Sequence, residues 1–173
     1  PAARLMFLQK LRGSDPAKAR ELLASTWKEE EPEERTAFIQ VLGKNLSLED
    51  EVFLEAALDD KRKEVRKKAA DLLAQIPDSA LVKRMQERLQ PLLKFKPAEE
   101  GSILKLKKGT KASLEINLPI ECSKVMQRDG IEAKPPAKEI GERAWWLAQM
   151  LGCVPPSYWR AQWGCTSADY YAA

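Results

Sequence analysis

The sequence predicts a mainly α-helical protein, in which two to three helical hairpins stack on one another and are followed by a small β-hairpin and a tryptophan-rich helical region. Three observations support this fold class. Glycine is scarce, with 8 in 173 residues, whereas the helix-favouring residues Leu, Ala, Lys and Glu are common. Apolar residues recur at helical spacing between residues 14 and 93. Helix-start and helix-stop sequences separate these apolar runs.

The length and composition suit one folded unit. A chain of 173 residues with 44% hydrophobic residues can bury one substantial core. We expect residues 1–93 to form the stacked helices. Residues 94–173, which contain the β-hairpin insertion and the tryptophan-rich helices, should pack on them as part of the same unit. The first residue is Pro rather than Met, which indicates a fragment or a processed product.

Two features of the sequence indicate a cytoplasmic protein. No apolar run reaches the roughly 18 to 20 residues that a membrane span requires, and no signal-peptide pattern begins the chain. The three cysteines, Cys122, Cys153 and Cys165, lie far apart and form no CxxC pair. We therefore expect reduced thiols, no metal or cofactor, and no contact with a membrane.

The first two predicted helices have recognisable start signals. Ser14 and Asp15 supply capping side chains before Pro16, whose missing N–H is harmless at the first helical position. A second helix is expected from Pro32, because two glutamates in its first turn favour the helix dipole. Gly43 marks its end.

Three more helices should follow. Ser47 to Asp50 reads S-x-x-D, a capping box that begins the third helix. The fourth begins after Asp60 and is stopped by Pro77, because proline cannot continue a helix. The fifth carries apolar residues at helical spacing from Leu81 to Leu89.

The fourth helix has two faces suited to packing. Ala70 and Ala74 form a small second face, opposite the large apolar stripe. We expect these small residues to let another helix approach. A helix contacted from two sides is what stacked hairpins require, because each hairpin alone leaves an apolar face uncovered. The large stripe consists of Val65, Ala69, Leu72, Leu73 and Ile76.

The pattern changes after Pro91. Residues 103–118 alternate apolar and polar side chains on both sides of Lys107 to Lys111, which predicts a β-hairpin with its turn there. The segment SKVMQRDGI predicts a short helix and a turn at Asp129–Gly130. A last strong helix is expected from about Ala137 to Leu151.

The fourth helix resembles part of a known repeat. The pattern L-D-D-x-x-x-x-V-R-x-x-A-A-x-L-L at residues 58–73 resembles the second helix of a HEAT repeat, and a Ser-capped helix precedes it. The resemblance implies a HEAT/ARM-like α–α superhelix of two to three helical hairpins.

A longer series of motifs is similar to a bacterial HEAT-like family of unknown function. The motifs span most of residues 15–164 and read SLEDEVFLEAALDDKRKEVRKKAADLLAQIPDSALVKRM, MQRDGI, GERAWWLAQML and VPPSYW. Members of that family are often encoded beside MoxR-type AAA+ ATPases and von Willebrand factor A-domain proteins. The resemblance therefore implies a partner of one of these kinds, but it assigns no activity and no catalytic residue.

Charge is unevenly distributed along the chain. The formal net charge is +3, yet residues 21–60 carry 12 acids against 3 bases, and residues 61–111 carry 15 bases against 6 acids. Bases in the first turn of a helix oppose its dipole, so we expect compensation within the chain from Asp59, Asp60, a Glu64–Lys68 pair and the acidic helix next to them. An acidic protein surface or nucleic acid remains an alternative partner. This basic cluster consists of Lys61, Arg62, Lys63, Arg66, Lys67 and Lys68.

Four of the five tryptophans lie within 19 residues near the end of the chain. We expect this aromatic group to pack the C-terminal region against the helices. The alternative is a partner-binding surface, because aromatic residues are frequent hot spots of protein interfaces. The candidate partner-binding residues are Trp146, Tyr158, Trp159 and Trp163.

The residues argue against catalysis. The chain contains no histidine, which removes the commonest general base and metal ligand, and it contains no phosphate-binding loop. We therefore expect a non-catalytic scaffold or adaptor for a protein partner, with an AAA+ ATPase or a von Willebrand factor A-domain protein favoured by resemblance. The alternative is a nucleic-acid-binding protein, similar to HEAT-like alkylpurine glycosylases, that uses the basic cluster.

Overall fold

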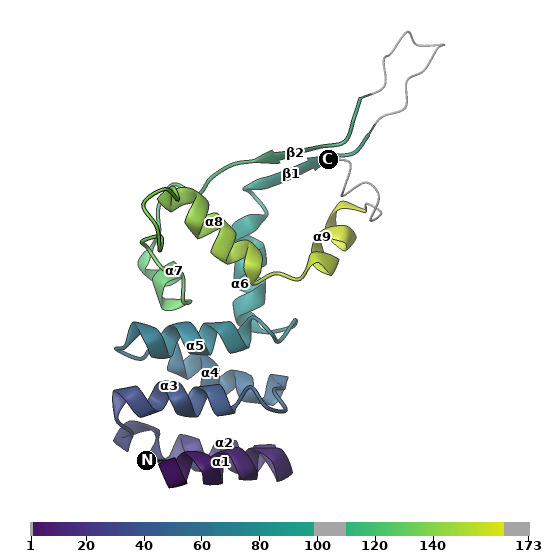
Figure 1. Cartoon of the computed structure of the whole chain (residues 1–173). Helices are drawn as coiled ribbons and strands as arrows, with labels where there is room; N and C mark the ends of the chain where they lie inside the picture. Colours follow the sequence, from purple (N-terminus) through teal and green to yellow (C-terminus); the bar gives the residue numbers. More distant parts are fainter. Residues whose placement is uncertain (1, 99–109, 165–173) are drawn as a thin grey trace.

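The computed structural model describes residues 2–98 and 110–164. Within these residues the chain is mainly helical and carries one small two-stranded antiparallel hairpin, which confirms the predicted fold class (Figure 1). No helix in this part of the chain is both long enough and apolar enough to cross a bilayer.

The N-terminal half is a stack of helices. Helix α1 packs on α3 and α3 packs on α5, while α2 pairs with α1 and α4 pairs with α5, so successive helices lie in layers (Figure 1). Helix α1 lies before the first helix that the sequence predicts. The elements are α1 (Ala2–Ser14), α2 (Pro16–Thr26), the 3-10 turn η1 (Trp27–Glu29), α3 (Pro32–Val41), the 3-10 turn η2 (Leu48–Asp50), α4 (Glu51–Ala57) and α5 (Lys63–Leu73).

Asp15 and the Ser47–Asp50 box cap helices as expected, whereas Ser14 ends α1 and its hydroxyl donates to the Leu11 carbonyl at 3.2 Å. The Asp15 carboxylate accepts a hydrogen bond from the backbone N–H of Lys18 at 3.0 Å and caps α2. Ser47 and Asp50 form the capping box, in which the backbone N–H of Ser47 donates to Asp50 at 3.0 Å. This box caps η2, and α4 follows directly. Local polar side chains therefore set where these helices begin.

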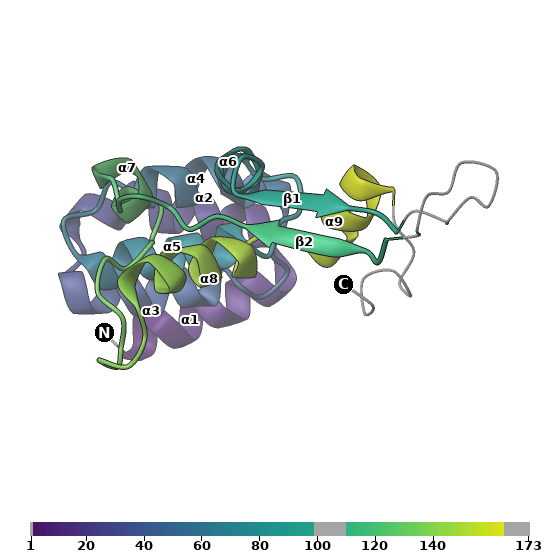
Figure 2. The ribbon, with the colours of Figure 1, turned by 90° about the horizontal axis from the view of Figure 1, so that it is seen from above.

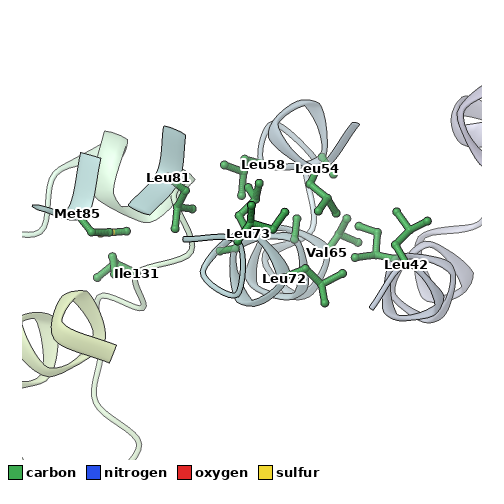
Figure 3. Close-up of a cluster of buried hydrophobic side chains, with 14 of the residues drawn as sticks. Leu42, Leu54, Leu58, Val65, Leu72, Leu73, Leu81, Met85 and Ile131 are labelled. Carbon is green, nitrogen blue, oxygen red and sulfur yellow. The ribbon is translucent and has the colours of Figure 1, made fainter. Parts of the chain in front are cut away.

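The apolar stripes meet in one core. The side chains of Leu54 from α4 and of Leu58, which caps its C-terminus, face Val65 and Leu73 from α5, and all four are fully buried (Figure 3). Helix α5 ends at Leu73, earlier than the expected stop at Pro77, because the N–H groups of Gln75 and Ile76 donate three residues back in tighter turns. Ile76, the last residue of the predicted stripe, is buried in these turns. Each stripe is thus covered by a neighbouring helix of the stack.

A buried ion pair fixes α1 to the loop before α4. The side chains of Arg12 and Asp50 are both fully buried, and Arg12 Nη1 donates to Asp50 Oδ1 at 2.9 Å. The remaining guanidinium donors reach backbone oxygens of Lys44 and Leu42, at 2.8 and 3.1 Å. Burial raises the pKa of Asp50, but hydrogen bonds from Arg12 and Arg20 outweigh this effect and hold the pKa below its usual value. Both charges are therefore paired in the interior.

The C-terminal half continues the two sides of the stack, one formed by α1, α3 and α5 and the other by α2 and α4. Helix α8 packs on α6. Seen from above, α8 lies on the side of α1, α3 and α5, whereas α6 lies on the side of α2 and α4 (Figure 2). The hairpin and α7 are thus inserted between two helices that pack on each other. The elements are α6 (Ala80–Leu89), β1 (Leu93–Lys96), β2 (Ser113–Ile116), α7 (Lys124–Arg128), α8 (Glu142–Gly152) and α9 (Pro156–Trp163).

The hairpin begins earlier than the sequence predicts. Strand β1 at residues 93–96 pairs with β2 at residues 113–116, with Leu93 opposite Ile116. The second predicted strand is confirmed, whereas the one beginning at residue 103 lies outside the described residues. The true first strand is only four residues long and follows Pro91 closely, so its alternation of Leu and Phe with Lys is too short to stand out.

The last long helix begins later than expected. Helix α8 starts at Glu142 rather than near Ala137. The backbone N–H of Ile140 donates to the Ala137 carbonyl at 3.3 Å, which closes a turn, and Gly141 precedes the helix as its N-cap. The apolar spacing from Ile140 onward cannot reveal this turn, because Ile140 continues the same periodicity.

The small face of α5 receives a backbone turn, where a helix was expected. Gly130 lies in the predicted turn after α7, with a φ of 85°, which favours glycine. A Cβ atom placed on Gly130 would lie 2.5 Å from the Cβ of Ala70. Two small residues therefore let the turn after α7 contact α5 directly.

We predict that Gly130→Ala destabilises the protein by about 1 to 3 kcal/mol, because the new methyl group would both strain the backbone and collide with Ala70. Gly152→Ala is the matched control, since no atom lies within 4 Å of its Cβ position. It should be neutral or stabilise by up to about 1 kcal/mol, as Ala favours a helix over Gly. Urea unfolding of both variants measures the difference, and equal effects would contradict this packing.

We also predict that Arg12→Ala lowers the free energy of unfolding by about 3 to 5 kcal/mol, because it leaves the Asp50 carboxylate buried with only part of its hydrogen bonding. Lys18→Ala, which removes an exposed ion pair with Asp15, should change it by less than about 0.5 kcal/mol. Chemical denaturation monitored by tryptophan fluorescence compares the two variants. A loss below about 1 kcal/mol for Arg12→Ala would show that the pair contributes little.

Candidate protein-binding surface

The basic cluster at the start of α5 is largely engaged within the chain. Arg66 Nη1 donates to the backbone oxygen of Asp60 at 2.8 Å. Lys67 Nζ lies 2.7 Å from Asp71 Oδ1, one turn further along the helix. Weaker contacts join Arg62 to Glu33 at 3.5 Å and Lys63 to Glu64 at 3.9 Å. Much of the positive charge is therefore compensated, although the cluster remains an untested candidate for an anionic partner.

The compensating acids are not all the expected ones. The carboxylates of the neighbouring α4 and the turn after it pair with arginines from other elements, because Glu55 contacts Arg84 at 2.9 Å and Asp59 contacts Arg128 at 2.6 Å. Among the described ion pairs there is no Glu64–Lys68 contact. Glu55 and Asp59 thus bind α6 and α7 rather than the basic cluster.

Helix α7 is held by a group of charged side chains. The side chain of Asp129, at the end of α7, is fully buried and accepts hydrogen bonds from Arg84 at 2.9 Å and Arg88 at 2.6 Å, both on α6. Arg128 reaches back to Asp59 beside α4. Because each arginine is bound by an acid from another element, α7 is fixed to both α4 and α6.

A second contact fixes the chain between β2 and α7. Arg143, in the first turn of α8, donates from Nε to the Pro119 carbonyl at 2.6 Å and from Nη2 to the Leu118 carbonyl at 2.8 Å. The loop is therefore held at its middle by α8 and at its end by α7. The backbone of this loop is held in position by contacts within the chain, without a bound partner.

Large apolar side chains are exposed along this fixed segment. Ile116, Leu118 and Ile120 alternate along the chain and are 52%, 39% and 89% exposed. Val125 on α7 and Ile140, three residues before Arg143, are also exposed. We call these five residues the apolar strip. Exposed apolar groups gathered on fixed backbone are typical of interaction sites.

The aromatic group lies mostly inside the C-terminal region. Trp146 and Trp159 are 8% and 3% exposed, and Trp146 Nε1 donates to the Ala133 carbonyl at 2.8 Å. The Tyr158 hydroxyl accepts a hydrogen bond from Gln90 at 2.8 Å, beyond the end of α6. These contacts agree with the packing role that we expected first, and they leave little of the two buried rings for a partner.

Trp163 connects α9 to the hairpin. Its ring stacks on Phe95 of β1, with centroids 5.4 Å apart, and lies 4.9 Å from the ring of Trp159. Helix α9 therefore covers part of one face of the hairpin. Of the four predicted aromatics, Tyr158 and Trp163 keep partly exposed surface.

A cleft of about 330 Å³ lies between α5 and α8. Its lining includes Ala70, Gly130, Gln149 and Cys153. Burial raises the pKa of the Cys153 thiol, which donates to the Gln149 carbonyl at 3.3 Å, so this cysteine is a neutral thiol without nucleophilic activation. Within residues 2–98 and 110–164, no group of three His, Cys, Asp or Glu side chains could hold a metal ion.

Sequence reasoning missed the apolar strip. The signal was present, because I-x-L-x-I at residues 116–120 has the period of a strand with one apolar face. The alternation predicted a strand of the hairpin, but it does not say which face of that strand is exposed. Only the arrangement of β2 and α8 leaves these side chains on the surface.

A protein-family model described as a family of unknown function (DUF5691) matches residues 1–173. No curated protein and no solved structure matches the chain.

We predict that acidification weakens the attachment of α7. The hydrogen bond from Arg128 lowers the pKa of Asp59 below its usual value, and burial opposes this only in part. A lowered carboxyl pKa stabilises the fold above the unfolded pKa near 4 and loses this contribution as the pH falls through the folded value. Urea midpoints between pH 7 and pH 3 should therefore fall more steeply in the native protein than in Asp59→Asn. Identical pH profiles would contradict this role.

Proposed function

Since the chain belongs to a family of unknown function over residues 1–173, we propose from its surface that it is a non-catalytic scaffold or adaptor that binds another protein. One observation carries the proposal: the apolar strip places large exposed side chains on backbone that Arg143 and the α7 contacts hold in place. A partner that covers these side chains would remove apolar surface from water without having to order this segment first.

The architecture that we propose for this scaffold is a HEAT-like superhelix. The successive packing of α1, α3 and α5 agrees with it, since each layer contacts the next. Stacks of this kind present extended binding surfaces. The partner favoured by resemblance is an AAA+ ATPase or a von Willebrand factor A-domain protein of bacteria.

Nucleic-acid binding through the basic cluster is the alternative function. It would require the cluster to face phosphates, and the bonds of Arg66 and Lys67 within the chain already use part of it. Duplex binding that falls steeply with salt would support this alternative. Reversal of charge at Lys61 and Lys68 should then abolish it.

The proposal is tested by affinity capture from bacterial extract, followed by binding of the identified protein in purified form. The double variant Ile120→Lys/Val125→Lys places charges on the apolar strip and should weaken binding by about tenfold or more, because each large apolar side chain buried contributes about 1.5 to 3 kcal/mol. Val52→Lys is the matched control, since Val52 on α4 is 82% exposed and lies outside the strip.

The two variants separate the outcomes. Loss of binding only in the strip variant supports a protein scaffold. Capture of nucleic acid alone, or protein binding that both variants leave intact, would overturn the proposal.

A further inference from the structure

The register of the hairpin determines which backbone groups point outward from it. The backbone N–H of Asn117 donates to the Leu92 carbonyl at 2.8 Å, so Leu92 and Asn117 form a hydrogen-bonded pair. In an antiparallel ladder such pairs alternate with non-bonded pairs. The next pair, Leu93 with Ile116, is therefore non-bonded. The N–H and C=O groups of Ile116, and of Leu114 two residues earlier, point away from β1 toward the outer edge of β2.

The two edges of the hairpin differ in what surrounds them. On β1, Lys94 and Lys96 flank the edge, Leu93 is buried, and Phe95 is stacked on Trp163 of α9. Charged lysines beside an edge are a device that prevents edge pairing, and α9 covers the face of the hairpin that carries Phe95. On β2, by contrast, the edge residue Ile116 is 52% exposed. Among the described residues, the open edge of the hairpin is that of β2.

We propose that the β2 edge binds an extended segment of the partner protein by β-strand addition, an inference that rests on the scaffold function proposed above. Unpaired N–H and C=O groups in a row match the main chain of a strand and cannot be matched by a helix, whose backbone groups are paired internally. The segment would extend the two-stranded sheet to three strands. The hairpin lies across the end of the helical stack (Figures 1 and 2).

The side chains beside the edge specify the composition of the segment. Strand alternation places Leu114 and Ile116 on one face of the sheet and Ser113, Glu115 and Asn117 on the other. A neighbouring strand should therefore alternate apolar residues with polar ones. It should carry Lys or Arg opposite Glu115, whose carboxylate has its nearest cation, Lys96, at 3.6 Å and remains half exposed.

The probe for this proposal is a displayed library of random nine-residue peptides, selected on the whole chain. Selected sequences should alternate apolar residues with polar ones and contain a base, and synthetic copies should bind in a fluorescence anisotropy assay. Helical amphipathic sequences with apolar residues at every third or fourth position would overturn the proposal.

Ile116→Pro is the decisive variant. It removes one of the two outward N–H groups of β2 and keeps that of Leu114, while leaving the inward-facing bonds of Glu115 and Asn117 to β1. Proline is tolerated at edge strands where its nitrogen faces outward. Peptide affinity should fall about tenfold or more, since at least one main-chain hydrogen bond is lost and the proline ring obstructs the edge. Lys138→Pro is the matched control. Lys138 is exposed in the turn that Ile140 closes on Ala137, where proline is favoured, and affinity should not change.

A second variant covers the case in which Ile116→Pro disturbs the hairpin. Ile116→Lys keeps the N–H group and places a charge beside the edge, as β1 itself does, so it should also weaken binding while near-ultraviolet circular dichroism of the aromatic group stays unchanged. Peptide binding that both variants leave intact overturns strand addition. Concentration-dependent dimerisation that Ile116→Pro abolishes also overturns it, because the edge would then pair with a second copy of the chain.

The outcomes of these experiments distinguish a failure of strand addition from a failure of the scaffold function. A captured partner whose binding depends on Ile120 and Val125 but not on the Ile116 N–H would support the scaffold function and contradict strand addition. Loss of binding in Ile116→Pro, together with retention in Lys138→Pro, supports both.

Discussion

The buried carboxylate of Asp129 is the contact on which the C-terminal half depends. It accepts hydrogen bonds from Arg84 and Arg88 of α6, so the end of α7 lies against the helical stack. Gly130 follows immediately and fits against Ala70 of α5 only because neither residue has a larger side chain. The hydrogen bonds to Asp129 and the close approach of Gly130 to Ala70 therefore depend on each other. A buried carboxylate without its arginines would be unfavourable, and the arginines reach it only if the turn sits close to α5.

The cations of this protein divide into two classes with different roles. Arginines such as Arg12, Arg84 and Arg143 make several directed hydrogen bonds, which their planar guanidinium groups suit, and they join elements distant in sequence. Lysines remain mostly on the surface. The basic cluster is therefore weaker evidence of function than its charge indicates, whereas the apolar strip exposes large side chains on backbone that is held in place.

The sequence predicts the helical stack well because its signals are local. Asp15 and the Ser47–Asp50 box act within a single turn, and the apolar stripe of α5 needs only helical periodicity to be recognised. The sequence does not predict those elements whose position depends on contacts between residues distant in the chain. Strand β1 is too short to be recognised without its partner, and nothing near Ile116 in sequence indicates that α8 and α9 leave that side uncovered. The candidate site is therefore largely a product of tertiary arrangement.

The insertion between α6 and α8 also bears on how the chain folds. Helices α1 to α5 gain most of their contacts from elements next to them in sequence, so loop closure opposes their assembly only weakly. Helix α6 instead packs on α8, and residues 90–141 separate these two helices in the sequence. Contacts of high sequence separation form slowly. The contact of α6 with α8 should therefore form more slowly than the contacts within the N-terminal stack.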